Sequence, residues 1–273
     1  MKRFLPLVAV AALASTLAAC GGGGGSNNTT STSAASNIPN PIVWCVDTTY
    51  PPAESIVNGK PAGYDIDIAN AVAKQLGSTA QIKVTGFTVI IPALKQKKCN
   101  AIISSMTITS DRAKQVNFVP YLDVGSFLMV KKGNPDHITG LASLSGKSAA
   151  VEASTTQLGF LQAENKTLQK QGKPLITIKS YPADTSAVAT IESGKVNAYF
   201  ADAAPVLYYI RTTGKFVQTT GKQLSTSPEG IATRKGDPLG KQIAHAITAL
   251  YANGKFQQIL AKWQASQFAL KNQ

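Results

Sequence analysis

Histidine, cysteine and acidic residues are scarce in this 273-residue chain. It has two histidines, three cysteines, and 14 acidic residues against 27 lysines and arginines, which gives a formal charge of +13. His137, His245, Cys45 and Cys99 make no cluster with the spacing of a metal site, so no metal is expected. The sequence also has no Gly-x-Ser-x-Gly, His-Glu-x-x-His or Walker A motif, which argues against common hydrolase, zinc protease and nucleotide-binding classes.

The excess of positive charge is spread along the chain. No basic helix and no stripe of lysines interleaved with aromatic residues stands out, so we expect no nucleic-acid partner. A solvated basic surface close to anionic lipid is the better interpretation.

A long apolar run is also missing, because residues 4–17 are too few to span a bilayer. Lys2 and Arg3 precede this run, and small residues follow it up to Cys20. The order is typical of a signal peptide over residues 1–19, and it resembles the lipobox of bacterial lipoproteins. That resemblance implies that Cys20 becomes the lipidated first residue and anchors the protein to a membrane outside the cytoplasm. The alternative is an ordinary signal peptide with a chance cysteine.

Residues 20–40 are rich in Gly, Ser, Thr and Asn and have almost no apolar side chains. Such a segment cannot bury a core, so we expect a flexible tether. The glycine run within it is not a phosphate loop, since no strand precedes it and no Lys-Ser or Lys-Thr follows. The folded body then begins near Pro41 and has roughly 230 residues, enough for two small domains or one large domain.

Within this body, short apolar runs alternate with segments whose apolar residues recur at helical spacing. The predicted strands are residues 42–46, 81–84, 101–103, 148–151, 176–180 and 198–200. The predicted helices are residues 66–76, 91–97, 111–116, 141–144, 156–170, 186–193, 204–213, 239–253 and 256–265, with Asp65 as the N-cap of the first and Pro92 in the first turn of the second.

Strands and helices that alternate twice over predict two α/β units, each with a mostly parallel sheet flanked by helices. Two further extended runs, residues 127–130 and 230–233, are candidates for crossings between the units. We therefore expect lobe one to comprise residues 41–129 and 232–273, and lobe two residues 130–231. A cleft between two lobes is a natural ligand site and hinge.

Three groups of motifs occur in a characteristic order. They are Gly63–Ala69 with Ala73–Gly77; Ile91–Leu94 with Cys99–Thr109, Arg112 and Phe118–Tyr121; and Gly230–Ala232 with Lys235–Asp237, Gly254–Lys255 and Lys262–Trp263. In order and spacing these resemble family 3 extracellular solute-binding proteins, the amino-acid-binding proteins of ABC importers, over Pro41 to Ala265. One departure is Asn100, where the family usually has Asp at a position regarded as structural.

The resemblance implies a two-lobe periplasmic-binding-protein type II fold, a free L-amino acid as ligand and no cofactor. It also implies a monomer that is not an enzyme and that delivers its ligand to an ABC permease in the inner membrane. A dehydratase on the same scaffold, acting on a cyclohexadienyl substrate or arogenate, is the main alternative. A surface sensor or adhesin without a transporter is another.

By the same resemblance, Arg112 pairs with the ligand carboxylate, because its planar fork matches a carboxylate bidentately. The loop before it supplies further contacts, from Ser105, Met106 and Thr107, and Thr156 donates from a helix N-terminus. Without the surrounding motif, Arg112 could as well be a surface helix arginine.

The remaining predicted ligand contacts are two aromatic and three acidic side chains. The family position of Asp202 binds the ligand ammonium, although an aspartate there could also be a helix N-cap. Tyr50 and Phe87 are expected to sandwich the ligand side chain, the alternative being core aromatics. Asp47 and Glu152 would face that side chain and favour a cationic or amide-bearing amino acid. Asp47 could instead cap the loop, and Glu152 could instead point to solvent.

Export permits a disulfide between Cys45 and Cys99. Cys45 lies within one expected strand and Cys99 precedes a neighbouring one, so the two cysteines are offset along the strands by several ångströms. This offset argues partly against the bond. The sequence leaves this question open.

Overall fold

The computed structural model describes residues 38–218 and 223–271. Cys20, the predicted signal peptide and the predicted tether up to residue 37 lie outside the described residues. Within the described part, no helix combines the length and the apolar character needed to cross a membrane.

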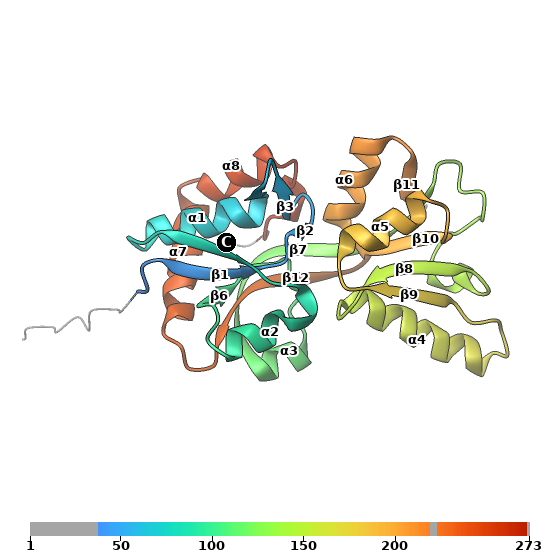
Figure 1. Cartoon of the computed structure of the whole chain (residues 1–273), viewed down its shortest axis with the longest axis horizontal. Helices are drawn as coiled ribbons and strands as arrows, with labels where there is room; N and C mark the ends of the chain where they lie inside the picture. The colour runs from blue at the N-terminus through green and yellow to red at the C-terminus, as the bar shows by residue number, and fades with distance from the viewer. Residues whose placement is uncertain (1–37, 219–222, 272–273) are drawn as a thin grey trace, which may run out of the picture. The chain divides into compact units, whose positions relative to one another are not determined.

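Nine strands join into one sheet (Figure 1). They are β1 (Ile42–Val46), β5 (Ala80–Val84), β6 (Ala101–Ile102), β7 (Val116–Lys131), β8 (Ser148–Glu152), β9 (Thr177–Tyr181), β10 (Ala198–Asp202), β11 (Phe216–Gln218) and β12 (Leu224–Arg234). The order is β5-β1-β6-β12-β7-β10-β8-β9, and β11 pairs with β7. Strands β5, β1 and β6 are parallel to one another, and so are β10, β8 and β9. The predicted α/β class with two parallel sets of strands is confirmed.

Strands β7 and β12 join the two parallel sets, and they run side by side through the middle of Figure 1. The first part of β7 pairs with β12, and its last residues pair with β10 and β11. At 16 residues, β7 is much longer than the predicted run of residues 127–130. Pro120 lies beside an irregularity in the β7–β12 register, where its missing N–H is tolerated.

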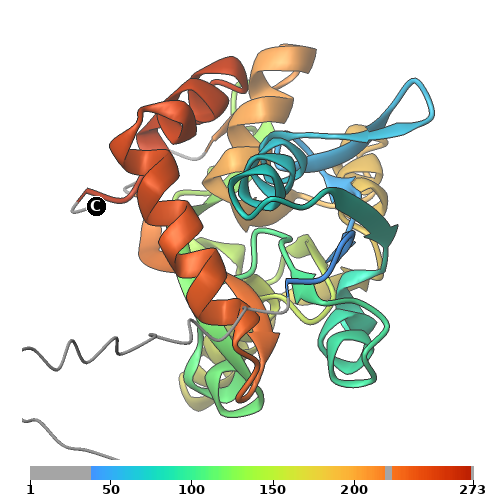
Figure 2. The same cartoon turned by 90° about the vertical axis from the view of Figure 1, so that its left-hand side faces the viewer.

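Helices cover both faces of the sheet. They are α1 (Tyr64–Gln75), α2 (Phe87–Lys95), α3 (Ser110–Gln115), α4 (Thr156–Lys170), α5 (Asp184–Glu192), α6 (Ala203–Thr213), α7 (Leu239–Ala252) and α8 (Lys255–Lys262), with 3-10 turns at Leu141–Leu144 and Ser266–Phe268. A small antiparallel sheet comprises β2 (Thr49–Tyr50), β3 (Glu54–Val57) and β4 (Lys60–Ala62). In Figure 2, α7 and α8 lie in front, in orange and red.

Alternation along each strand sends side chains into different cores. On β8, Ala150 packs in the cluster that includes α1, α5, α6, α7 and α8, whereas Ala149 and Val151 pack in the cluster that includes α4. On β1, Trp44 belongs to the first of these clusters, and Cys45 belongs to a third cluster with α2. The sheet is therefore the middle layer of an α/β/α arrangement, and both of its faces are buried.

The predicted roles of Pro92 and Asp65 at two helix starts are wrong. Helix α2 begins at Phe87 rather than at residue 91, so Pro92 lies inside the helix instead of in its first turn. Helix α1 has Gly63 at its N-cap and no side-chain cap. Asp65 does not cap it, because its carboxylate accepts hydrogen bonds from Ser105 N and Tyr121 Oη, at 2.8 Å each.

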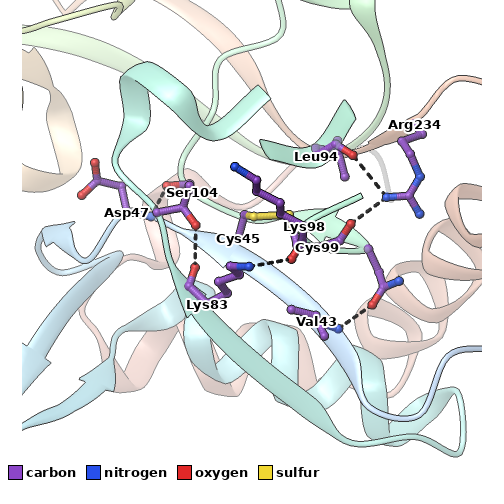
Figure 3. Close-up of a disulfide and its surroundings, with 11 residues drawn as sticks. Val43, Cys45, Asp47, Lys83, Leu94, Lys98, Cys99, Ser104 and Arg234 are labelled. Atoms are coloured by element: carbon purple, nitrogen blue, oxygen red, sulfur yellow. Dashed lines mark hydrogen bonds between the residues drawn. A yellow bond between two sulfur atoms is a disulfide. The ribbon is translucent and has the colours of Figure 1, made fainter. Parts of the chain in front are cut away.

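Cys45 and Cys99 form a disulfide, with their Cα atoms 5.7 Å apart (Figure 3). In the strand ladder Cys45 lies opposite Ile102, which is the offset that the sequence suggested. Asn100 holds the loop before β6 against β1. Its side-chain oxygen accepts from Val43 N at 2.8 Å, and its backbone N–H donates to Val43 O at 2.7 Å. The Asn100 amide thus supports the fold, in keeping with a structural position.

Candidate functional site

A narrow cavity lies at the carboxyl ends of the parallel strands. Its lining comes from both parallel sets, since Asp47 follows β1 whereas Glu152 and Asp202 end β8 and β10. In open α/β sheets, ligands bind beyond the carboxyl ends of the strands. The lining residues are Asp47, Tyr50, Glu54, Phe87, Ser104, Ser105, Thr107, Arg112, Glu152, Thr155, Thr156, Gln157 and Asp202.

Nine of the ten predicted ligand residues are among these lining residues; Met106 is not. Its side chain is buried in the core cluster with Cys45 and α2. Its backbone oxygen accepts from Gly230 N at 2.9 Å, so Met106 ties the loop after β6 to β12. The alternation of side chains along this loop directs Ser105 and Thr107 to the cavity and Met106 away from it.

Arg112 is the cation of the cavity. Its Nη1 donates to Thr107 O at 2.7 Å, and its Nη2 donates to Ser154 O at 2.9 Å, across the cavity. The guanidinium carbon lies 5.2 Å from the centroid of the Phe87 ring, within the range of a cation–π contact. Burial lowers the pKa of Arg112, and the nearby Asp202 carboxylate opposes this shift. Arg112 is not a free surface arginine: its orientation is fixed by two carbonyls and an aromatic face.

Asp202 occupies the N-cap position of α6 but makes no side-chain cap hydrogen bond. Its Oδ1 accepts from Gln157 Nε2 at 2.6 Å and from Ser126 Oγ at 3.3 Å. Its Oδ2 accepts from Tyr50 Oη at 2.9 Å. Burial raises the pKa of Asp202 to about 6, and these hydrogen bonds oppose a larger rise. Asp202 lines the cavity, and with a pKa of about 6 its carboxyl group is mostly ionised at neutral pH.

The two predicted aromatic walls are both present. Tyr50 is buried and bonds to Asp202, and burial raises the pKa of its hydroxyl well above the usual range. Phe87 is half-buried and begins α2, where its N–H donates to Asp47 Oδ2 at 2.7 Å. Both rings line the cavity, and each residue is held by a hydrogen bond, from the hydroxyl of Tyr50 and from the backbone N–H of Phe87.

Asp47 and Glu152 differ in how their carboxyl oxygens are satisfied. Asp47 accepts from Phe87 N and, at 3.0 Å, from Thr49 N, and these bonds oppose the rise in its pKa that burial causes. Glu152 does not point to solvent: it is 4% exposed, and its Oε1 has no hydrogen-bond partner. Burial, followed by the charge of Asp184, raises the pKa of Glu152 to about 10.

Thr156 is the first residue of α4, and Thr155 is its N-cap, with an oxygen that accepts from Leu158 N at 3.4 Å. The unpaired N–H groups of the first helical turn are suited to an anionic ligand group. Gln157, also at this helix start, joins the cavity lining through its bonds to Ser126 and Asp202.

Sequence reasoning missed four lining residues: Glu54, Ser104, Thr155 and Gln157. Ser104, Thr155 and Gln157 adjoin predicted residues, so the loop motifs carried a signal for them. Glu54 carried none, because it reaches the cavity through the hairpin of β3 and β4. Ser104 Oγ donates to Glu54 Oε1 at 2.7 Å, and burial and Asp65 raise the pKa of Glu54 well above its usual range.

The charges of the lining are unbalanced. Asp47, Glu54, Glu152 and Asp202 are acidic, and Arg112 is the single basic residue of the lining. A buried set of acids with so little positive charge is costly unless protons or a cationic ligand neutralise it.

Comparison with known proteins gives a consistent result. The chain is 32% identical to ABC transporter arginine-binding protein 1 of Escherichia coli (strain K12) over 80% of this chain and 88% of that protein. A solved structure of an ancestral arginine-binding protein bound to arginine has 33% identity and a TM-score of 0.75, covering 82% of this chain and 98% of that one. Its glutamine-bound form has 32% identity and a TM-score of 0.75, covering 84% and 99%.

These proteins are named for binding and transport, which supports a binding protein over the dehydratase alternative. A sequence profile of the bacterial extracellular solute-binding proteins, family 3, matches residues 42–266, which is most of the chain. The chain therefore belongs to the family 3 bacterial extracellular solute-binding proteins.

Proposed function

We propose that this protein captures a free L-amino acid with a cationic side chain, arginine first among them, and delivers it to an ABC importer. The observation that carries the proposal is the charge pattern of one cavity, with one guanidinium and four carboxyl groups among its lining residues. The relatives named for arginine agree with it.

The cavity offers one group of each charge to the backbone of the ligand, the guanidinium of Arg112 and the carboxylate of Asp202. Its carboxylate would pair with Arg112 and with the N–H groups at the start of α4, close to Thr156. Its ammonium would pair with Asp202, whose carboxyl group faces the cavity. Thr107 and Ser105 add hydroxyl or backbone contacts.

The ligand side chain would lie between Tyr50 and Phe87 and end near Asp47 and Glu152. The carboxylate and ammonium of the ligand cancel, so its backbone adds no net charge to the cavity. The remaining acids, Asp47 and Glu152, therefore favour a ligand side chain with a positive charge. A guanidinium supplies five N–H donors, enough for more than one carboxyl group. A lysine ammonium fits the charge and supplies fewer donors in a less fixed geometry.

Capture would proceed by closure of lobe two, residues 130–231, onto lobe one, residues 41–129 and 232–273. Strands β7 and β12 are the chain segments that cross between them. Contacts made across the cavity favour the closed state, and Arg112 to Ser154 O and Tyr50 to Asp202 are two of these. A ligand that binds both lobes stabilises closure by its own differential affinity.

We retain Cys20 as the lipid-anchored first residue of the exported protein, with residues 20–37, which lie outside the described residues, as its tether. The predicted tether extended to residue 40, but Ile38 packs against the core and Asn40 Oδ1 accepts a hydrogen bond from Thr79 Oγ1 at 3.1 Å, so residues 38–40 belong to the folded body. The protein would act as a monomer on the periplasmic or cell-surface side of a bacterial membrane, with the permease as its partner. Mass spectrometry of the protein purified from its native membranes tests the acylation of Cys20.

Isothermal titration with arginine, lysine, histidine and glutamine tests the ligand class. We expect arginine to bind most tightly and to raise the melting temperature, because a ligand of the native state stabilises it. Replacement of Arg112 by Met should abolish this shift. If none of the twenty common amino acids produced heat or a thermal shift with the wild-type protein, the proposed function would be wrong.

A further inference from the structure

Two buried carboxyl groups, those of Glu152 and Asp184, lie at or next to the ligand cavity, and neither forms an ion pair with a described residue. Glu152 lines the cavity, whereas Asp184, fully buried at the first position of α5, lies outside its lining. Each has one carboxyl oxygen without a hydrogen-bond partner, Oε1 of Glu152 and Oδ2 of Asp184.

The sheet places both groups on the same face. Ala150 precedes Glu152 by two residues on β8, so the side chains of both point to the face that α5 covers. Tyr199 on β10 pairs with Ala150, packs on this face, and donates from its hydroxyl to Asp184 Oδ1. Glu152 also lies opposite Tyr181 on β9, three residues before Asp184.

The groups around this pair are acidic or neutral. From the other side of the cavity, Thr49 Oγ1 accepts from Asp184 N at 3.1 Å, and Thr49 N donates to Asp47 Oδ1. Asp202 from β10 adds another carboxyl group, and Tyr199 adds a neutral hydroxyl. On the α4 side, Thr155 donates its hydroxyl to Glu152 O, not to the carboxyl group.

Arg112 does not neutralise the pair. The acids whose charge acts most on its guanidinium are Asp202 and Glu229. Accordingly, burial raises the pKa of Asp184 to about 8, with Tyr199 opposing and Asp47 and Asp202 adding to the rise. The pKa of Glu152, raised to about 10, has Asp184 as its largest charged influence. In the empty cavity at neutral pH the pair is therefore protonated.

We propose that Glu152 and Asp184 form one acid pair whose protonation responds to the charge of the ligand side chain. The pair keeps its protons when the cavity is empty or holds a neutral side chain, and it releases one to solvent when a cationic side chain arrives. The carboxylate left on Glu152 then pairs with the cation. Glu152 contacts the ligand, and Asp184 acts through Glu152, so Asp184 is a positioning residue. The inference rests on the proposed binding of an amino acid in this cavity.

The matched ligands for the test are arginine and citrulline, because citrulline replaces the guanidinium by a neutral ureido group of similar shape. Titration calorimetry from pH 6 to 8, in buffers of different ionisation enthalpy, counts the protons released on binding. Asp202 contributes equally to both ligands, since both carry the same ammonium. We expect arginine to release about one proton more than citrulline, and its affinity relative to citrulline to rise by up to about tenfold per pH unit.

The variants Glu152→Gln and Asp184→Asn test the two members separately. We expect Glu152→Gln to remove the extra proton and to lower the arginine-to-citrulline affinity ratio at pH 8 by at least about tenfold. Asp184→Asn should flatten the pH dependence of that ratio, a readout that a merely structural role would not move. Glu192→Gln, at the exposed end of the same helix, should change neither, and melting curves establish that each variant is folded.

Equal proton release with arginine and citrulline in the wild-type protein would overturn the inference, as would a Glu152→Gln protein that keeps the difference. Either result leaves the proposed function standing if arginine still binds. If neither ligand bound, and no other amino acid did, the proposed function itself would fail.

Discussion

Tyr50 and Asp202 meet across the ligand cavity through two hydrogen bonds. Tyr50 Oη donates to Asp202 Oδ2 at 2.9 Å, and it accepts from Asp202 N at 3.0 Å. The two residues are 152 positions apart: Tyr50 lies on β2 of the small sheet, and Asp202 ends β10 of the large sheet. One tyrosine hydroxyl thus satisfies a buried N–H and holds the carboxyl group that we expect to bind the ligand ammonium.

Replacement of Tyr50 by Phe should weaken ligand binding and shift its pH dependence. The hydrogen bond from Tyr50 opposes the rise of the Asp202 pKa above about 6. Without it, the pKa of Asp202 rises further, and the ionised form that pairs with an ammonium requires a higher pH. We expect roughly tenfold weaker binding of arginine at pH 7, since a hydrogen bond to a charged group contributes about 1.5–3 kcal/mol. Titration calorimetry from pH 5 to 8 measures both effects.

Tyr208→Phe is a control for the loss of a hydroxyl elsewhere, since Tyr208 lies on α6 outside the cavity lining. Its binding curves should match those of the wild-type protein. An acidic limb of binding that stays at the same pH in Tyr50→Phe would contradict the role of this hydrogen bond.

Arg112→Lys should reduce affinity by roughly 100-fold although the charge is kept. The guanidinium already donates to two carbonyls and lies over Phe87, and its planar fork matches a carboxylate. A lysine ammonium cannot make the same set of bonds. An ammonium can keep one of the two charge-assisted hydrogen bonds to the ligand carboxylate, and the loss of the other costs about 1.5–3 kcal/mol, a range of roughly 10- to 150-fold.

Arg211→Lys supplies the comparison, because Arg211 is an exposed arginine that lies over Tyr208 on α6. We expect it to bind arginine like the wild-type protein. Equilibrium dialysis with radiolabelled arginine measures all three proteins. Equal affinity of Arg112→Lys and Arg211→Lys would remove Arg112 from the proposed site.

The order of strands and helices was predictable because local signals agreed with the final structure. Helix α4 has the predicted bounds, since Thr155 supplies a cap and no proline or glycine pair interrupts its spacing. Strand β7 was predicted only in part, because its residues from Val116 to Ser126 are held in the sheet by pairing with β12, a segment about 100 residues further along the chain. The small sheet of β2, β3 and β4 was missed, since its strands are short and partly exposed.

The site divides in the same way. Asp47, Glu152 and Asp202 line the cavity, and they could be singled out because each follows or ends a predicted strand. Glu54 and Asp184 were not foreseen, since their positions depend on a hairpin and on a helix that packs against another part of the chain. Which side chain of a loop turns inward, as with Met106, also depends on contacts between distant segments.

Loss of the Cys45–Cys99 disulfide should destabilise the protein without abolishing ligand binding. The bond spans 54 residues, and closing a loop of this length removes about 4 kcal/mol of denatured-state entropy. For a body of this size the melting temperature should fall by roughly 8–16 °C. Differential scanning calorimetry of a Cys45→Ala/Cys99→Ala protein measures the change.

A reducing agent should lower the melting temperature of the wild-type protein and leave the double variant unaffected. Asp47 keeps its bonds to Thr49 and Phe87 without the disulfide, so arginine should still bind. An unchanged melting temperature in the double variant would mean that the bond adds no stability.

The buried acids predict that the empty protein loses stability as the pH rises. In the unfolded chain Glu152 and Asp184 ionise near pH 4.5 and 3.8, whereas in the fold their pKa values are about 10 and about 8. Between pH 5 and pH 8 the folded state therefore binds more protons than the unfolded state, and stability falls. Each group that stays protonated contributes about 1.4 kcal/mol per pH unit to the slope. The contribution of these groups is complete below about pH 4 and is lost as the pH rises through their folded pKa values.

Urea unfolding of the empty protein at pH 5, 6, 7 and 8 measures this slope. Glu152→Gln should make it shallower, because the glutamine carries no proton to lose, whereas the exposed control Glu192→Gln should keep it. Saturating arginine should also reduce the slope, since a cation in the cavity favours the ionised acids. If stability instead rose from pH 5 to pH 8 in both the wild-type protein and Glu152→Gln, these carboxyl groups would have to be ionised in the fold, and the prediction would be wrong.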